Sequence, residues 1–84
     1  MKHAGDKALD ALEQILARLR GLEGLRERKR GVFYRKSAAF AHFHEDPAGF
    51  FADLKCGKDF VRFPVNTPGE IEAFMREVRR ALAS

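Results

Sequence analysis

The chain has 84 residues, of which 45% are hydrophobic and 33% charged, and its formal net charge is +4. This composition is typical of a folded globular protein, and the length predicts one domain over residues 1–84. No apolar run approaches the ~20 residues that a membrane-spanning helix needs. Cys56 is the only cysteine, so no disulfide can form within the chain. We therefore expect a cytoplasmic protein without membrane association and without a cofactor.

The first predicted element is an amphipathic helix over residues 6–20. Apolar residues recur in it at spacings of three and four, which predicts one buried stripe: Leu9, Leu12, Ile15, Leu16 and Leu19. Asp6 is the expected N-cap and Gly21 the expected C-cap. Residues 1–5, including His3, are expected to be disordered. The glycine-rich, charged segment from 21 to 31 is interpreted as a linker within the domain.

From Val32 onward the pattern changes to alternating residues rich in aromatic and β-branched side chains, which predicts a sheet. The strands are expected at residues 32–35, 38–44, 50–55 and 60–65. The turns between them are short enough for hairpins, so the sheet is predicted to be an antiparallel meander.

A second helix is predicted from about residue 68 to residue 83. Thr67, Pro68 and Glu70 have the spacing of a capping box with proline at the first helical position. The predicted fold is therefore α+β, with a four-stranded antiparallel meander flanked by an N-terminal and a C-terminal helix (α-β-β-β-β-α).

Alternation along the predicted strands divides their side chains between two faces of the sheet. The face expected to form the core holds Val32, Tyr34, Ala39, Ala41, Phe43, Ala52, Leu54, Val61, Phe63 and Val65. The opposite face is expected to hold Phe33, Phe40, His42, His44, Phe51, Asp53, Lys55, Phe60 and Arg62. We expect a second copy of the chain or a ligand to cover the second face, because burying its charged residues beneath a helix would be costly.

The hairpin lengths place His42, Asp53 and Arg62 in one row across three strands. Such a row is either an oriented acid–base pair or a cross-strand ionic ladder without a catalytic role. His42, His44 and Asp53 also have the composition of a two-histidine, one-carboxylate metal site. Cys56 lies in a predicted turn between Lys55 and Lys58, whose charges could lower its pKa, although a passive thiol is the favoured interpretation.

The excess positive charge is concentrated before and within the first predicted strand. This basic segment comprises Arg26, Arg28, Lys29, Arg30, Arg35 and Lys36. It is either a solvated loop or a contact surface for nucleic acid.

Two stretches carry a resemblance to a known family: GVFYRKSAAFAHFHEDPAGFFADLK, and FVRFPVNTPGEIEAFMREV after it. They resemble small bacterial proteins called a luciferase-like domain of unknown function. The resemblance implies an α+β fold and a bacterial origin, without light-emitting activity. A weaker similarity is to the MmcQ/YjbR-type proteins, in which helices surround a meander sheet and which have been considered as DNA binders.

Three hypotheses about function follow. The first is a non-enzymatic binding or interaction module, homodimeric, which contacts a partner or small ligand through Phe40, His42, His44, Phe51, Asp53 and Arg62. The second is a metal-assisted or acid–base enzyme that uses His42, His44 and Asp53. The third is nucleic-acid binding through the basic segment from Arg26 to Lys36.

Overall fold

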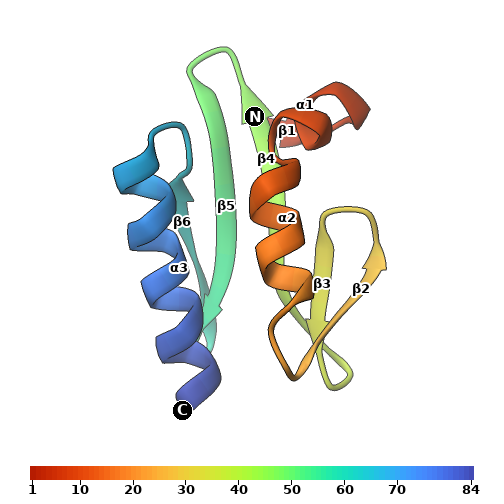
Figure 1. The fold of residues 1–84 in the computed structure, drawn as a ribbon, viewed down its shortest axis with the longest axis vertical. Helices are drawn as coiled ribbons and strands as arrows, with labels where there is room; N and C mark the ends of the chain where they lie inside the picture. Colours follow the sequence, from red (N-terminus) through yellow and green to blue (C-terminus); the bar gives the residue numbers. More distant parts are fainter.

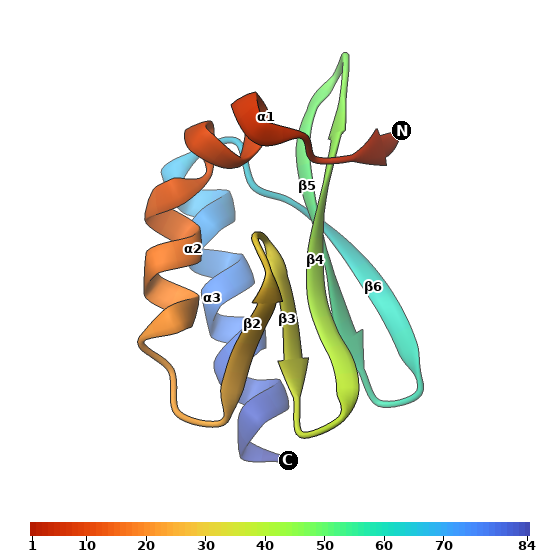
Figure 2. The same ribbon diagram turned by 90° about the vertical axis from the view of Figure 1, so that its right-hand side faces the viewer.

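The computed structural model describes residues 1–84 as two layers, with an antiparallel sheet on one side and all helices on the other (Figures 1 and 2). The predicted α+β class with helices at both ends is confirmed. None of the helices is both long enough and apolar enough to cross a membrane. One face of the sheet packs on the helices, and no helix covers the other, which is called the open face below (Figure 2).

The N-terminal region contains more structure than the sequence pattern predicts. Residues 1–5 include a short strand, β1 (Lys2–His3), which pairs with the middle of the sheet, so the prediction of disorder was wrong. The predicted first helix is divided at Leu12 into α1 (Asp6–Ala11) and α2 (Glu13–Arg20). Its N-cap is Gly5 rather than Asp6, whereas Gly21 is the C-cap as predicted.

The sheet consists of β2 (Leu25–Lys29), β3 (Val32–Arg35), β4 (Ala38–Asp46), β5 (Gly49–Cys56) and β6 (Asp59–Pro64). Their order in space is their order in sequence, all neighbours are antiparallel, and β1 pairs with β4. The four predicted strands correspond to β3–β6. The sheet has two strands more than predicted, because β1 and β2 lie in segments interpreted as disordered and as a linker.

Strand β2 forms inside the segment from 21 to 31 because Glu27 has hydrogen-bond partners on both sides of the strand in the sequence. The Glu27 carboxylate accepts hydrogen bonds from the Arg20 guanidinium of α2 and from the Gly31 backbone N–H. Gly31 has φ of 80°, a conformation that glycine adopts without the strain of a Cβ, and this allows the chain to turn between β2 and β3. The glutamate thus holds the strand beneath the helix.

Helix α3 (Pro68–Ala83) begins with the predicted capping box. The Thr67 hydroxyl accepts a hydrogen bond from the Glu70 N–H at 3.1 Å, and the Glu70 carboxylate accepts one from the Thr67 N–H at 3.2 Å. At the other end of the helix, the Arg35 guanidinium donates to the carbonyls of Ala81 and Leu82. Both ends of α3 are therefore satisfied, and its apolar side lies on the sheet through Phe74, Met75 and Val78.

The predicted division of the sheet into two faces holds for β5 and for β4 from Ala41 onward, but is wrong for β3 and for the beginning of β4. Phe33 is 0% exposed in the core, and Tyr34 lies on the open side, where the Arg28 guanidinium is 4.6 Å from its ring centroid. The cause is a bulge in β4: Phe33 pairs with Ala41, and Tyr34 pairs with Ala39.

Four further face assignments are corrected by the structure. Val32 pairs with His42 and Ala39 pairs with Tyr34, so both lie on the open side rather than in the core. Phe40, the extra residue of the bulge, is 3% exposed and belongs to the core, so it is not part of the open face. Val61 was predicted to be in the core but is 41% exposed, because β6 is the last strand of the sheet. The predicted core positions Ala41, Phe43, Ala52, Leu54 and Val65 are all buried.

Candidate functional site

The centre of the candidate site is the row of polar side chains predicted from the sequence. Across β4, β5 and β6, His42 pairs with Asp53 and Asp53 pairs with Arg62. We call the sheet face opposite the helices the open face. It carries the side chains of His3, Tyr34, His42, His44, Phe51, Asp53, Lys55, Phe60 and Arg62, placed there by strand alternation and register. The predicted row is therefore confirmed.

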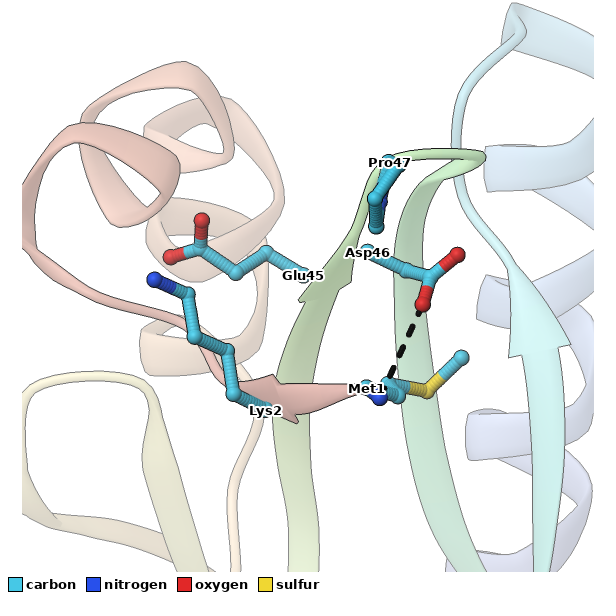
Figure 3. A pocket seen from close by; sticks show the side chains of 5 residues that line it. All are labelled: Met1, Lys2, Glu45, Asp46 and Pro47. Atoms are coloured by element: carbon cyan, nitrogen blue, oxygen red, sulfur yellow. Dashed lines mark ion pairs between the residues drawn. The ribbon is translucent and has the colours of Figure 1, made fainter.

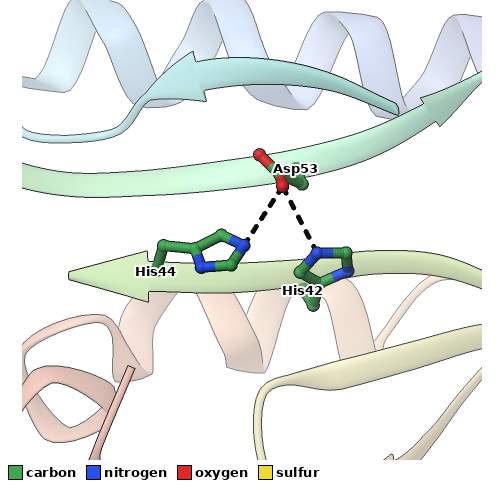
Figure 4. Close-up of side chains that lie close together, drawn as sticks. All are labelled: His42, His44 and Asp53. Atoms are coloured by element: carbon green, nitrogen blue, oxygen red, sulfur yellow. Dashed lines mark hydrogen bonds and ion pairs between the residues drawn. The ribbon is translucent and has the colours of Figure 1, made fainter. Parts of the chain in front are cut away.

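Asp53 is the hub of this row and is buried, with 7% of its surface exposed. The Arg62 guanidinium donates two hydrogen bonds to its carboxylate, at 2.7 Å to Oδ1 and 2.8 Å to Oδ2. His44 Nε2 lies 3.1 Å and His42 Nε2 lies 3.3 Å from the same Oδ2 atom, and Figure 4 shows both rings pointing at it. A single carboxylate thus holds two imidazoles and one guanidinium in fixed positions.

Burial and neighbouring charges act in opposite directions on this network. Burial alone would raise the pKa of Asp53, but the hydrogen bonds and charge of Arg62 outweigh it, and the pKa lies below its ordinary value. Burial lowers the pKa of His42, and the attraction of Asp53 offsets only part of this effect. At neutral pH the network therefore contains an ionised Asp53 and a neutral His42.

These protonation states limit the chemistry that the site can perform. A carboxylate accepts hydrogen bonds, so an imidazole that donates to Asp53 does so through a proton on Nε2. His44 Nδ1 is buried and has no hydrogen-bond partner. Because Asp53 is held ionised by Arg62, it is poorly suited to take up a proton as a general base. The arrangement orients side chains for binding better than it prepares a proton transfer.

His3 is a member of the cluster that sequence reasoning missed. β1 pairs His3 with His44, and the two rings stack with their centroids 4.8 Å apart. The Ala4 N–H donates to the Phe43 carbonyl at 3.0 Å, which fixes the strand on β4. A strand of two residues has no detectable period, so the sequence carries no signal for it.

The metal-site hypothesis can be compared with the positions of the ligand atoms. One nitrogen each from His42 and His44 and an oxygen of Asp53 lie within 4.8 Å of one another. The ligands of a tetrahedral zinc ion lie about 3.4 Å apart, which is similar to the two nitrogen-to-oxygen distances. Arg62 disfavours a cation at this position because its guanidinium already forms an ion pair with the Asp53 carboxylate. The spacing fits a metal ion, but the charge of Arg62 weakens the fit.

Aromatic and basic side chains surround the row. Phe60 is 40% exposed, and its ring centroid lies 5.0 Å from that of His42 and 5.3 Å from the Lys55 ammonium. Phe51 is half-buried opposite His44. Of the predicted contact residues, only Phe40 lies away from this face.

No family model, curated protein or solved structure matches the chain. The resemblance to the luciferase-like domain family and the weaker one to MmcQ/YjbR-type proteins therefore stay predictions. Inference about function depends on the residues themselves.

The structure separates the six residues of the predicted basic segment. Arg30 pairs with Asp10 and Glu13 on the helix side, and Arg35 binds the end of α3. Lys36 lies in the turn after β3, with φ of 59°. Strand register and contacts place the remaining three on the open face: Arg26, Arg28 and Lys29. The basic segment is therefore not one continuous surface.

Two other features, Cys56 and a hollow beside the N-terminus, add no reactive or binding group to the candidate site. Cys56 is half-buried against the core, and burial together with Glu77 raises the pKa of its thiol, so the lysines beside it do not activate it. Figure 3 shows a shallow hollow lined by Met1, Lys2, Glu45, Asp46 and Pro47, where the terminal ammonium lies 3.7 Å from Asp46. Neither adjoins the row of His42, Asp53 and Arg62 through a hydrogen bond.

Proposed function

We propose that the protein is a non-enzymatic binding module and that the open face is its binding surface. One observation carries the proposal: all helices pack on one side of the sheet, and the other side presents an ordered cluster of His42, His44, Asp53 and Arg62 (Figures 2 and 4). Ordering these polar side chains costs conformational entropy when the protein folds. A ligand that binds them in their fixed positions therefore does not have to offset that cost on binding.

The partial burial of the cluster supports the same proposal. The side chains of His42 and His44 are 21% and 12% exposed, so their positions are constrained, yet a ligand on the surface can reach them. The cluster sits on strands rather than on loops, and strands hold binding groups with greater precision. These are properties of a preformed contact surface.

A second copy of the chain is a further partner, which would bind at the β6 edge of the sheet beside the open face. β6 is an edge strand, and it exposes Phe60 and Val61 by 40% and 41%. Exposed apolar residues on an unpaired edge favour strand-to-strand association. Self-association through β6 is therefore part of the proposal.

Native mass spectrometry of the purified protein, with metal analysis of the same sample, tests the proposal. We expect wild-type protein to carry a bound small molecule or metal ion that His42→Ala loses, whereas a dimer formed through β6 should persist in His42→Ala. Gln14→Ala, at an exposed position of α2, is the matched control and should behave as wild type. A bare monomer in all three samples would contradict the proposal.

A metal ion is a second candidate, favoured by the three converging ligand atoms of His42, His44 and Asp53. Isothermal titration calorimetry with zinc chloride tests whether these atoms bind a metal ion. The double variant His42→Ala/His44→Ala is expected to lose zinc binding. Arg62→Gln removes the competing charge and is expected to bind zinc several-fold more tightly than wild type. Equal titration curves for all three proteins would exclude this site.

A further inference from the structure

The two sides of the sheet differ in how their charges are arranged. On the helix side, basic and acidic side chains neutralise one another: Arg18 with Glu72, Arg20 with Glu13 and Glu27, and Arg30 with Asp10 and Glu13. These pairs leave little uncompensated charge between α2, β2 and α3. The helix side is therefore electrically balanced.

The open face is not balanced. Strand β2 contributes Arg26, Arg28 and Lys29 to it, and β5 and β6 contribute Lys55 and Arg62. Its central carboxylate, Asp53, is buried and already bonded to Arg62. Basic groups thus stand at both borders of the face. Its two acids are both near positive charge: Asp53 is bonded to Arg62, and Asp46, at the end of β4, lies beside the terminal ammonium.

Aromatic rings lie between these two basic borders. Tyr34 is beside β2, Phe60 is on β6, and His42 and His44 are in the middle on β4. Two of the basic groups rest on rings: Arg28 at 4.6 Å from the centroid of Tyr34 and Lys55 at 5.3 Å from that of Phe60. Positively charged groups and flat rings therefore lie next to one another on this face.

We propose that the open face binds single-stranded nucleic acid. The inference rests on the proposed function, since it names the ligand class of the same surface. Phosphates contact the basic groups of β2, β5 and β6, and bases stack on the exposed ring of Phe60 and on the partly exposed rings beside it. Five neighbouring strands span about 19 Å, and in known sheet-based RNA-binding modules a comparable four-stranded sheet stacks two or three bases.

A single strand fits this surface better than other polyanions do. In a duplex the bases are already stacked on one another, so the rings of the open face would have nothing to contact. An acidic peptide or an anionic membrane would satisfy the charges but would not use a row of flat rings. The combination of charge with exposed rings selects for a ligand that has both phosphates and bases.

Fluorescence anisotropy with labelled 12-nucleotide single strands of RNA and of DNA, at 50 mM salt, tests the inference. We expect binding to at least one of them, and the ratio of the two affinities distinguishes recognition of RNA from recognition of DNA. Raising the salt to 200 mM should weaken binding roughly 20- to 200-fold if several phosphates are neutralised. The DNA duplex of the same sequence should bind at least tenfold more weakly.

Two pairs of variants assign the binding to the open face. Arg28→Glu/Lys55→Glu should lose more than tenfold in affinity, whereas Arg76→Glu/Arg79→Glu, on the exposed side of α3, makes the same change in net charge and should lose less than threefold. Phe60→Ala should weaken binding about tenfold. Val61→Ala, the neighbouring residue of equal exposure on the other side of β6, should not.

Three results would overturn the inference: no binding of either single strand, equal losses in both charge variants, or equal affinity for the duplex. Circular dichroism of each variant shows whether it is folded, and a wild-type titration monitored by backbone amide NMR shifts locates the contact without any variant. Absence of nucleic-acid binding, together with a different ligand that His42→Ala loses, would overturn this inference and leave the proposed function standing.

Discussion

Replacing Asp53 by asparagine is the most direct test of the hydrogen-bond network at the centre of the open face. The carboxylate accepts donors on both oxygens, from Arg62 at 2.7 and 2.8 Å and from two imidazoles on Oδ2. An amide of the same shape can accept on one side only, so its NH2 group must face at least one donor. His44 would be most affected, because its other ring nitrogen is buried without a partner.

The expected loss of stability follows from how exposed these partners are. A hydrogen bond to a charged group contributes about 1.5–3 kcal/mol, but the side chain of Arg62 is 47% exposed and can be hydrated instead. We therefore expect Asp53→Asn to lower the free energy of unfolding by about 1–3 kcal/mol. In a domain of this size each kcal/mol corresponds to a fall in Tm of about 4–8 °C.

Urea denaturation followed by circular dichroism measures this loss, and NMR titration of the histidines gives a second readout. Asp53 raises the pKa of His42 against the effect of burial, so the pKa should fall further in Asp53→Asn. Asp59→Asn, at the exposed first residue of β6, is the control and should change neither quantity. Unchanged stability and an unchanged His42 titration in Asp53→Asn would refute the network.

Three further predictions concern the fold. Phe33→Ala should destabilise by about 3–5 kcal/mol and Phe60→Ala by less than about 1 kcal/mol in urea denaturation; equal effects would contradict the face assignment. Thr67→Ala should cost about 1 kcal/mol in the same assay, and no loss would mean that the cap is not formed in solution. The hydrogen bond from Arg20 lowers the pKa of Glu27 in the folded protein. The stabilisation from this ion pair is therefore fully present above about pH 4.5 and is lost as the pH falls through the lowered pKa. Arg20→Gln should reduce the loss of stability on acidification, and an unaltered pH dependence would count against the pair.

Elements with strong local signals were predictable from the sequence. The capping box of α3 and the short turns around β4, β5 and β6 fix where those elements begin and which residues face one another. The row of His42, Asp53 and Arg62 followed from these turn lengths alone, and the structure has the same register. Where turn residues and alternation agree, pairing across strands can be derived without coordinates.

The remainder depended on contacts between distant parts of the chain. The bulge at Phe40 shifts the pairing of β3 by one residue, and no local pattern distinguishes a bulged strand from a regular one. Strand β2 consists mainly of charged residues, which have low strand propensity, and it is held by the contact of Glu27 with Arg20 and Gly31. His3 reached the site only because β1 pairs with β4.

The brevity of β1 has a consequence for the motion of the open face. A strand of two residues with two paired positions has few hydrogen bonds to break, so it detaches at a small fraction of the free energy of global unfolding. Each detachment removes the His3 ring from His44 while β4 and β5 stay paired. The amides of residues 3–5 should therefore exchange with solvent far faster than those of β4. We expect the surface around His44 to alternate between a covered and an uncovered form without unfolding of the domain.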